Sequence, residues 1–505
     1  MHVGRRILAV ISVLAVAAQA VPAQLNDFEQ AAARVAARAK SGPAAPRRAR
    51  NVILFVGDGM GISTITAARI LEGQRKGQLG EDNRLGFEDF PHTALVRTFS
   101  ANQQTSDSAP TATAMVTGWH ANDSALSVGP ALGENESDAA VVARHTLRTV
   151  LEEAEARGLA TGIVTTTRIT HATPASNYAH TPNRDWEYAG QLPLGASLPD
   201  IAAQLLQHQQ IGNGIEVVLG GGREVMTDTT TTDPEYPALK GRRRDGRNLI
   251  TEWLAAQRGS QYVWKRDDLL RIDARKTSHL LGLFEPSHMR YDADRGRDPG
   301  GEPSLAEMTT KAIEVLSRNT RGYYLMVEGG RIDHAHHAGN AYRALTDTIA
   351  FSDAVRAAAQ LTDARDTLIL VTADHSHVMT ISGYPARGNP ILGLAKGPGA
   401  SGPTLDAGGR PYATISYANG PGFAIRDGGV DDGPPRQVAA GRDQNLAEVD
   451  TTAPEFHQQS LVGTRAETHG GEDVALYARG PGADLVRGGI NQNEIYHIMR
   501  RALGY

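Results

Sequence analysis

The sequence predicts an α/β protein: a three-layer sandwich whose large, mostly parallel central sheet is flanked by helices. Short apolar runs recur along the chain, and amphipathic helical patterns such as LAEMTTKAIEVLSR lie between them. The apolar runs read NVILFVG (51–57), TGIVTTT (161–167), IEVVLGG (215–221), GYYLMVEGG (322–330) and TLILVTA (367–373). Continuous apolar runs are typical of strands buried on both faces, and their alternation with helices indicates a parallel sheet. Ligands of such sheets bind at the carboxyl ends of the strands.

Two segments precede the first predicted strand. Residues 1–23 start with Arg5 and Arg6, continue with an apolar stretch over 7–18 and end in small residues, which predicts a cleavable secretory signal peptide. The alternative is a short membrane anchor, although the stretch is short for a membrane span. We therefore expect a periplasmic or secreted protein without a membrane anchor. Residues 24–50 are rich in Ala and Arg and are expected to form an N-terminal arm with a short helix and a linker.

The amino-acid composition changes between residues 383 and 466. Gly, Pro, Asp and Arg are frequent there, and strand-like pieces such as YATISYANG are short. We interpret 383–466 as an inserted lobe. The core then comprises 51–382 and 467–505, because ETHGGEDVALYARG restores the earlier pattern after the lobe.

Composition narrows the possible partners and cofactors. The 505 residues carry a net charge of −5 without a long basic or acidic run, which argues against nucleic acid or an anionic membrane as a partner. The chain has no cysteine, which excludes disulfides and cysteine metal ligands. Any metal ion must therefore be held by His, Asp or Glu.

Ionisable side chains gather where the predicted strands end. They are Asp58, His171, Glu328, Asp333, Asp374 and His375. Asp333 and His337 are four residues apart, so a helical turn places them on one face as half of a zinc site; the alternative is capping at a helix start. Asp374 and His375 can bend toward one ion where their strand ends, or Asp374 can cap the next segment. His469 precedes two glycines, which allow a close backbone approach; otherwise it is an ordinary packed histidine.

The stretch DSAPTATA contains a candidate nucleophile, Ser108. No Ser–His–acid pattern or GxSxG elbow surrounds it, so its activation would have to come from a metal ion. The small residues after it predict a helix, whose N-terminus favours a phosphate group. The alternative is that Ser108 only caps this helix. Arg184, in AHTPNRDWEY, either binds the phosphate with two hydrogen bonds from its planar guanidinium or lies on the surface as an ordinary arginine.

Taken together, these motifs resemble those of the alkaline phosphatase family. The resemblance rests on NVILFVGDGMGIST, DSAPTATAMVTG, VTTTRITHATPASNYAHTPNR, VEGGRIDHAHH, LVTADHSH and ETHGGEDVALYARGP, which follow one another in the family's order. It implies a phosphomonoesterase that acts on small phosphate monoesters at a site with two zinc ions and one magnesium ion. It also implies a homodimer, with residues 383–466 as a crown-like lobe at the interface.

The resemblance also implies roles for individual residues. Ser108 would form a phosphoserine, and Arg184 would bind the phosphate. The implied ligands are Asp333, His337 and His469 for the first zinc ion, Asp58, Asp374 and His375 for the second, and Asp58, Thr173 and Glu328 for magnesium. His171 and His334 stand where the best-known enterobacterial members have Asp and Lys, which would alter the surroundings of magnesium and phosphate. A calcium site of animal-type members maps onto Glu235, Phe284, Glu285 and Glu302. The last of these stands where those members have Asp.

Three other functions share parts of this pattern. A sulfatase on the same superfamily scaffold would share the Ser-x-Pro sequence, but its signature has Arg at the position of Ala112. A phosphodiesterase relative would more often use Thr as the nucleophile and lack Arg184. A secreted metal-binding or phosphate-binding protein would have lost Ser108 or a metal ligand, and the sequence has kept all of them.

Overall fold

The computed structural model describes residues 26–40, 48–423 and 445–505. The proposed signal peptide, 1–23, lies outside these residues. Within them, no helix combines the length and the apolar character that crossing a membrane requires.

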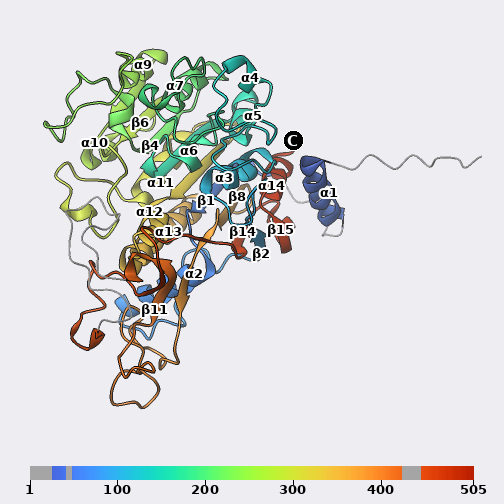
Figure 1. The fold of residues 1–505 in the computed structure, drawn as a ribbon. Helices are drawn as coiled ribbons and strands as arrows, with labels where there is room; N and C mark the ends of the chain where they lie inside the picture. The colour runs from blue at the N-terminus through green and yellow to red at the C-terminus, as the bar shows by residue number, and fades with distance from the viewer. Residues whose placement is uncertain (1–25, 41–47, 424–444) are drawn as a thin grey trace, which may run out of the picture.

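The core is built on a ten-stranded sheet, which confirms the predicted α/β class (Figure 1). The strand order is β15-β2-β14-β8-β1-β7-β3-β4-β6-β5. Neighbouring strands are parallel, except that β14 runs antiparallel to both β8 and β2. The strands are β1 (Asn51–Gly57), β2 (His92–Arg97), β3 (Ala160–Arg168), β4 (Val217–Gly221), β5 (Ser260–Val263), β6 (His279–Leu283), β7 (Tyr323–Gly329), β8 (Thr367–Ala373), β14 (Val474–Arg479) and β15 (Gly488–Asn491).

The five predicted apolar runs form the centre of this sheet. They correspond to β8, β1, β7, β3 and β4, which are adjacent in the order given above. Every residue of β1, β7 and β8 is buried. These strands are continuously apolar because helices cover both of their faces, so neither face of the strand meets water.

Two groups of helices form the outer layers. In one group α11 and α2 pack on α13, and α11 and α13 also contact β7. In the other, α3, α5 and α14 pack on one another, and α14 also carries α1. Figure 1 shows the two groups on either side of the central strands. Their members are α2 (Ile62–Arg75), α11 (Leu305–Leu316), α12 (Arg331–His337) and α13 (Ala341–Leu361) in the first, and α1 (Asp27–Lys40), α3 (Ser108–Thr117), α5 (Val150–Ala156), α6 (Ala172–Ala175) and α14 (Glu494–Leu503) in the second.

The remaining elements lie around the rim of the sheet. The helices are α4 (Ala139–Ala143), α7 (Ile201–Gln207), α8 (Arg223–Met226), α9 (Leu249–Ala256) and α10 (Arg266–Arg271). Two small sheets consist of β10 (Met379–Ile381), β11 (Ile415–Gly420) and β12 (Ser460–Gly463), and of β9 (Ser376–His377) and β13 (His469–Gly470). Strands β11 and β12 belong to the proposed lobe, whereas β10 precedes residue 383, so this small sheet joins the lobe to the core. Residues 424–444 of the proposed lobe lie outside the described part.

A pair of buried carboxylates lies where α5 leads into β3. Glu155 accepts a hydrogen bond from the Thr161 hydroxyl at 2.5 Å, and Glu216 accepts one from the Thr161 backbone N–H at 2.7 Å. Burial raises the pKa of Glu155 to about 8, with a further contribution from Glu216, and burial raises the pKa of Glu216 to about 7. Because both values exceed that of an unfolded glutamate, about 4.3, the folded state binds more protons above that pH. The stability that the protonated pair supports is therefore complete below about pH 4 and is lost as the pH rises through 7 and 8.

Replacing Glu155 with Gln should stabilise the protein selectively at alkaline pH. The amide cannot ionise, so we expect a gain of about 1–3 kcal/mol in the free energy of unfolding at pH 9 and little change at pH 5. Thermal melts at the two pH values measure this difference. Glu134→Gln is the matched control, since Glu134 is exposed. Equal shifts at pH 5 and pH 9 would contradict the assignment.

Candidate active site

The candidate site lies at the carboxyl ends of three adjacent parallel strands. Val56 of β1 is in register with Glu328 of β7, and Gly57 is in register with Ala373 of β8. Asp58 and Asp374, which follow β1 and β8, therefore emerge beside Glu328. The convergence of polar side chains expected from the sequence is confirmed for these three residues, all of which are fully buried.

Ser108 is the first residue of α3 and is 2% exposed. Its hydroxyl oxygen lies 3.1 Å from His375 Nε2 and 3.5 Å from Asp58 Oδ1. The side chain that caps α3 belongs to Asp107, which accepts a hydrogen bond from the Ala109 N–H. The interpretation of Ser108 as merely a helix cap is therefore wrong, because the preceding residue does the capping and leaves the hydroxyl facing Asp58 and His375.

Arg184 is held beside Ser108 by two contacts. Its Nη1 lies 2.6 Å from Asp107 Oδ2, and its Nη2 donates to His171 Nε2 at 2.9 Å. Burial opposes ionisation of Asp107, but the Arg184 guanidinium outweighs it and holds the pKa of that carboxyl below its usual value. The guanidinium is thus a partly buried fork with a fixed orientation, which suits it to bind a phosphate.

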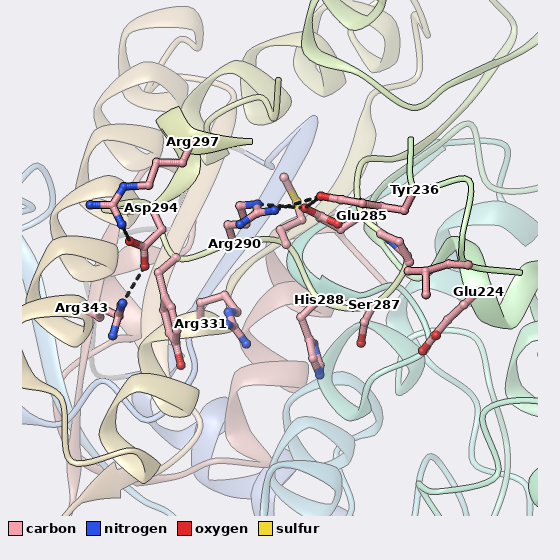
Figure 2. A pocket seen from close by; sticks show the side chains of 14 residues that line it. Glu224, Tyr236, Glu285, Ser287, His288, Arg290, Asp294, Arg297, Arg331 and Arg343 are labelled. Carbon is pink, nitrogen blue, oxygen red and sulfur yellow. Dashed lines mark hydrogen bonds and ion pairs between the residues drawn. The ribbon is translucent and has the colours of Figure 1, made fainter. Parts of the chain in front are cut away.

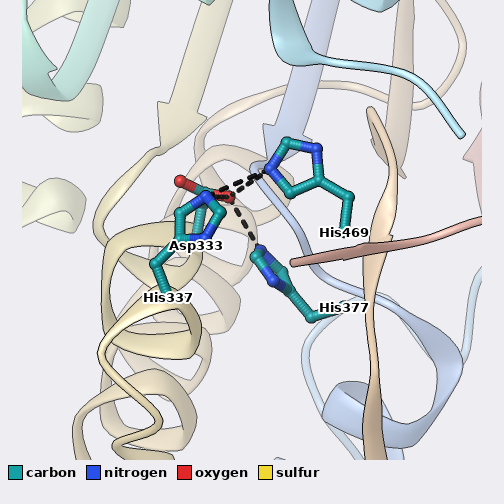
Figure 3. Close-up of side chains that lie close together, drawn as sticks. All are labelled: Asp333, His337, His377 and His469. Carbon is teal, nitrogen blue, oxygen red and sulfur yellow. Dashed lines mark hydrogen bonds and ion pairs between the residues drawn. The ribbon is translucent and has the colours of Figure 1, made fainter. Parts of the chain in front are cut away.

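Three imidazoles converge on one carboxylate oxygen at the first candidate metal site (Figure 3). Asp333 Oδ1 lies 3.3 Å from Nε2 of His337, 3.3 Å from Nε2 of His469 and 2.7 Å from Nε2 of His377. The structure thus brings the predicted residues Asp333, His337 and His469 together. The His469 ring also stacks on that of His375 at 3.6 Å between centroids, so this site adjoins the second.

His377 is a member of this group that the sequence prediction missed. Its Nδ1 is hydrogen-bonded to the Glu467 carboxylate. The other oxygen of that carboxylate accepts a hydrogen bond from the Val378 N–H at 2.7 Å. Although burial lowers it, Glu467 and then Asp333 raise the pKa of His377 to about 10. With a carboxylate at each ring nitrogen, His377 is placed to orient Asp333. The available signal was the His-x-His spacing from His375, because alternate residues of a strand share a face.

The second candidate site joins Asp58, Asp374 and His375. His375 Nε2 lies 3.4 Å from Asp58 Oδ1 and 3.2 Å from Asp374 Oδ2, and the Gly59 N–H donates to Asp374 at 3.0 Å. Burial, and then the Asp374 charge, raises the pKa of Asp58, and burial raises that of Asp374 to about 6. Burial lowers the pKa of His375, so its neutral ring keeps a lone pair that it can offer to a metal.

A third group gathers around Glu328. Its carboxylate accepts hydrogen bonds from the hydroxyls of Thr165 and Thr167, and it lies within ligand distance of Asp58 and His171. Burial raises the pKa of Glu328 to about 7. Thr173, which the sequence also predicted here, is buried in α6 directly after His171 and Ala172.

The hydrogen bonding of these three groups indicates whether their side chains can hold metal ions. Buried oxygens normally have a partner, because leaving one unpaired costs free energy. Four buried oxygens at these groups form no hydrogen bond, namely Asp58 Oδ2, Thr173 Oγ1, Glu328 Oε1 and Asp374 Oδ2, although the last lies 3.2 Å from His375 Nε2. The two groups with imidazoles and carboxylates suit zinc, and the oxygen set of Asp58, Thr173 and Glu328 suits magnesium.

The predicted calcium ligands are only partly brought together. Glu235 and Glu285 form a group with Asp298 rather than with Glu302. The Glu302 carboxylate instead accepts hydrogen bonds of 3.0 and 3.2 Å from the Arg290 backbone N–H, and Phe284 is buried beside Glu285. The sequence prediction missed Asp298 because it lies in a polar loop whose path has no local signal.

Two arginines contact this acidic group. Arg223 Nη2 lies 2.6 Å from Glu235, while Arg290 Nε lies 3.2 Å from Glu285 and 3.3 Å from Asp298. Both guanidiniums are shared, since Arg223 also pairs with Asp233, and burial and then Glu235 raise the pKa of Glu285 to about 8. The group therefore stays acidic, Glu302 does not belong to it, and the calcium site stays a prediction.

His171 and His334 lie together at the edge of the magnesium-type group. Their ring centroids are 5.5 Å apart, and the ring of His288 packs against both at 5.3 and 4.4 Å. His171 accepts a hydrogen bond from Arg184. This contact places His171, with His334 packed against it, beside the arginine that is predicted to bind phosphate.

The comparisons with known proteins agree on one protein family. The family model described as alkaline phosphatase matches residues 49–505. The tissue-nonspecific isozyme of alkaline phosphatase from Gallus gallus is 44% identical over 463 residues, which cover 90% of this chain and 84% of that protein. An alkaline phosphatase from Gadus morhua is 42% identical over 90% of this chain and 92% of its own length.

Solved structures show the same fold. The crystal structure of Thermus thermophilus alkaline phosphatase has a TM-score of 0.63 and 25% identity, and the match covers 92% of this chain and 94% of that one. Alkaline phosphatase from the Antarctic bacterium TAB5 has a TM-score of 0.60 at 20% identity, covering 91% and 99%. A variant of that bacterial protein is described with Mg bound in the M3 site, at a TM-score of 0.58, 20% identity and the same coverage.

Proposed function

Because the chain belongs to the alkaline phosphatase family, we propose that it hydrolyses phosphate monoesters through a phosphoserine at Ser108, at a site with two zinc ions and one magnesium ion. The observation that carries this proposal is the position of the Ser108 hydroxyl, which is buried, faces His375 and Asp58, and lies beside the clamped Arg184.

The metals would be held by the three groups described above. Asp333, His337 and His469 would hold one zinc ion, Asp58, Asp374 and His375 the other, and Asp58, Thr173 and Glu328 the magnesium ion. When bound, these ions supply the positive charge that lowers the pKa of the Ser108 hydroxyl and neutralises the phosphoryl oxygens. His377 orients Asp333, since its ring is fixed between Asp333 and Glu467.

Each side chain of the site then has its own role in the reaction. Arg184 binds two phosphoryl oxygens and turns the phosphorus toward Ser108. The Ser108 oxygen forms a bond to phosphorus while the bond to the ester oxygen breaks, and the leaving alcohol takes up a proton. The positive end of α3 stabilises the phosphoserine. Water then attacks phosphorus, which releases inorganic phosphate and restores the Ser108 hydroxyl.

A panel of three aryl esters tests the proposed reaction. The purified protein should hydrolyse an aryl phosphate with a kcat/KM at least about 10²-fold above those for the matching aryl phosphodiester and aryl sulfate, because Arg184 and the metals together match a dianionic phosphoryl group. A preference for the diester would indicate a phosphodiesterase, and a preference for the sulfate would indicate a sulfatase. Either outcome contradicts the proposal.

We further propose a periplasmic or secreted homodimer with the lobe at its interface. Exposed apolar side chains in and beside the lobe support this arrangement, namely Ile381, Tyr384, Leu405, Leu461 and Val462. Large apolar side chains that are exposed in a single chain are often covered at protein interfaces.

A further inference from the structure

A cavity of about 590 Å³ lies beside the active site (Figure 2). This volume is in the usual range for sites that bind small molecules. Its walls come from the loop that follows β6, from the start of α12 and from α13, and they carry four arginines against three carboxylates. The arginines are Arg290, Arg297, Arg331 and Arg343, and the carboxylates are Glu224, Glu285 and Asp294.

Arg331 is the member of this wall that lacks an anionic partner. It is 6% exposed, and no carboxylate of the described residues lies within ion-pair distance of its guanidinium. Its Nη1 donates to His334 Nδ1 at 2.9 Å, its Nε has no hydrogen-bond partner, and its guanidinium lies 3.9 Å from the Tyr291 ring centroid. A buried charge without a direct ion pair is costly, so this position favours an anion in the cavity.

The neighbouring charges add to this preference. Asp294 is shared between two guanidiniums, since Arg343 Nε lies 2.8 Å and Arg297 Nη1 3.6 Å from its oxygens. Figure 2 shows Asp294 between these two arginines, with Arg331 and His288 side by side on the same wall. Glu224 is paired with Arg242 at 3.2 Å, and Glu285 with Arg290. The carboxylates of the wall are thus engaged already, and none of them pairs with Arg331. The buried Asp347 carboxylate acts on Arg331 electrostatically without coming within ion-pair distance.

A layer of histidines connects the cavity to the phosphate-binding arginine. Arg331 contacts His334, the His334 ring packs on that of His171, and His171 accepts from Arg184. His288 lines the cavity and packs on both of these rings. The links are 2.9 Å from Arg184 to His171, 5.5 Å between the ring centroids of His171 and His334, and 2.9 Å from His334 to Arg331, so both guanidiniums border the same layer of histidines.

We propose that this cavity is a second phosphate subsite, and that the protein prefers small bisphosphates in which a sugar-sized linker joins the scissile phosphate at Arg184 to a second phosphate at Arg331. The proposal rests on the phosphomonoesterase activity proposed above and names the class of substrate for the same site. The second phosphate supplies the direct ion pair that Arg331 lacks, and the exposed Arg297 of the same cavity adds to the attraction.

Two substrates that differ only in the second phosphate test this proposal. Hexane-1,6-diol bisphosphate should have a kcat/KM about 10-fold or more above that of hexyl phosphate, mostly through a lower KM, and the ratio should shrink at high salt. 6-Phosphooxyhexanoate, with a carboxylate in place of the second phosphate, should fall between them if guanidinium geometry matters. A ratio near one for the wild type overturns the proposal.

Variants separate the subsite from the catalytic machinery. Arg331→Met should bring the bisphosphate-to-monophosphate ratio close to one, and Arg297→Ala, whose side chain is 71% exposed and can be removed without repacking, should lower the ratio several-fold. Arg271→Gln, on the surface helix α10, is the control and should leave the ratio unchanged. If Arg331→Met lowers both substrates equally and Arg297→Ala has no effect, Arg331 only positions His334 and the subsite is refuted. If hexyl phosphate is not hydrolysed at all, it is the proposed function that fails.

Discussion

Replacing Ser108 with Ala is expected to lower the turnover of an aryl phosphate by about 10³-fold or more. The Ser108 hydroxyl is the group that faces Asp58 and His375 from the start of α3, and the Ala side chain has no oxygen to attack phosphorus. Metal content, measured by mass spectrometry, should stay close to that of the wild type, because the ligand carboxylates and imidazoles remain.

The matched control for this variant is Ser106→Ala. Ser106 is also buried, two residues earlier, but its hydroxyl donates to the Asp107 carbonyl and does not face the metal-type groups. We expect its turnover to stay within a few-fold of the wild type. Turnover of Ser108→Ala within about 10-fold of the wild type would remove the phosphoserine from the mechanism.

Metal removal is the second large effect. Dialysis against a chelator should abolish turnover, and zinc with magnesium should restore it, whereas calcium alone should not. The physical reason is the set of unpaired buried oxygens at Asp58, Glu328 and Asp374, which a cation satisfies and which repel one another without it. Turnover that survives exhaustive chelation, with metal content confirmed to be absent, contradicts this account.

The metal-free protein should also show a characteristic dependence of stability on pH. In the absence of metals, burial raises the pKa of Asp374 to about 6 and that of Glu328 to about 7. Their folded-state pKa values exceed the unfolded ones, so the stability that these two protonated carboxyl groups contribute is complete below about pH 4 and is lost as the pH rises through 6 and 7. The gap between the melting temperatures of the loaded and the chelated protein should therefore widen between pH 5 and pH 8.

The centre of the fold could be predicted from the sequence, and its edges could not. Strands β1, β7 and β8 are buried on both faces, so they are continuous apolar runs that stand out in the sequence. Strand β2 alternates buried and exposed residues over a short stretch, and β15 begins with two glycines. Such strands are defined by their neighbours in space more than by their own residues, which is why sequence patterns did not reveal them.

In the candidate site, too, some residues could be predicted from the sequence and others could not. Asp58, Glu328 and Asp374 were predictable because parallel strands deliver their end residues to one edge of a sheet. The role of His377 depends on Glu467, which is far away in sequence and closes the other side of its ring. The choice of Asp298 over Glu302 depends on the path of a polar loop and on Arg290, and no periodicity encodes either.

The identity of the phosphorylated residue during turnover distinguishes a phosphoserine at Ser108 from every other route of hydrolysis. The wild-type protein is mixed with an aryl phosphate, quenched in acid within the turnover time, digested and analysed by mass spectrometry. The account predicts one added phosphoryl group on the peptide that contains Ser108, absent in Ser108→Ala. A phosphoryl group on a different side chain, or hydrolysis at full rate with Ser108 unmodified at every quench time, would contradict it.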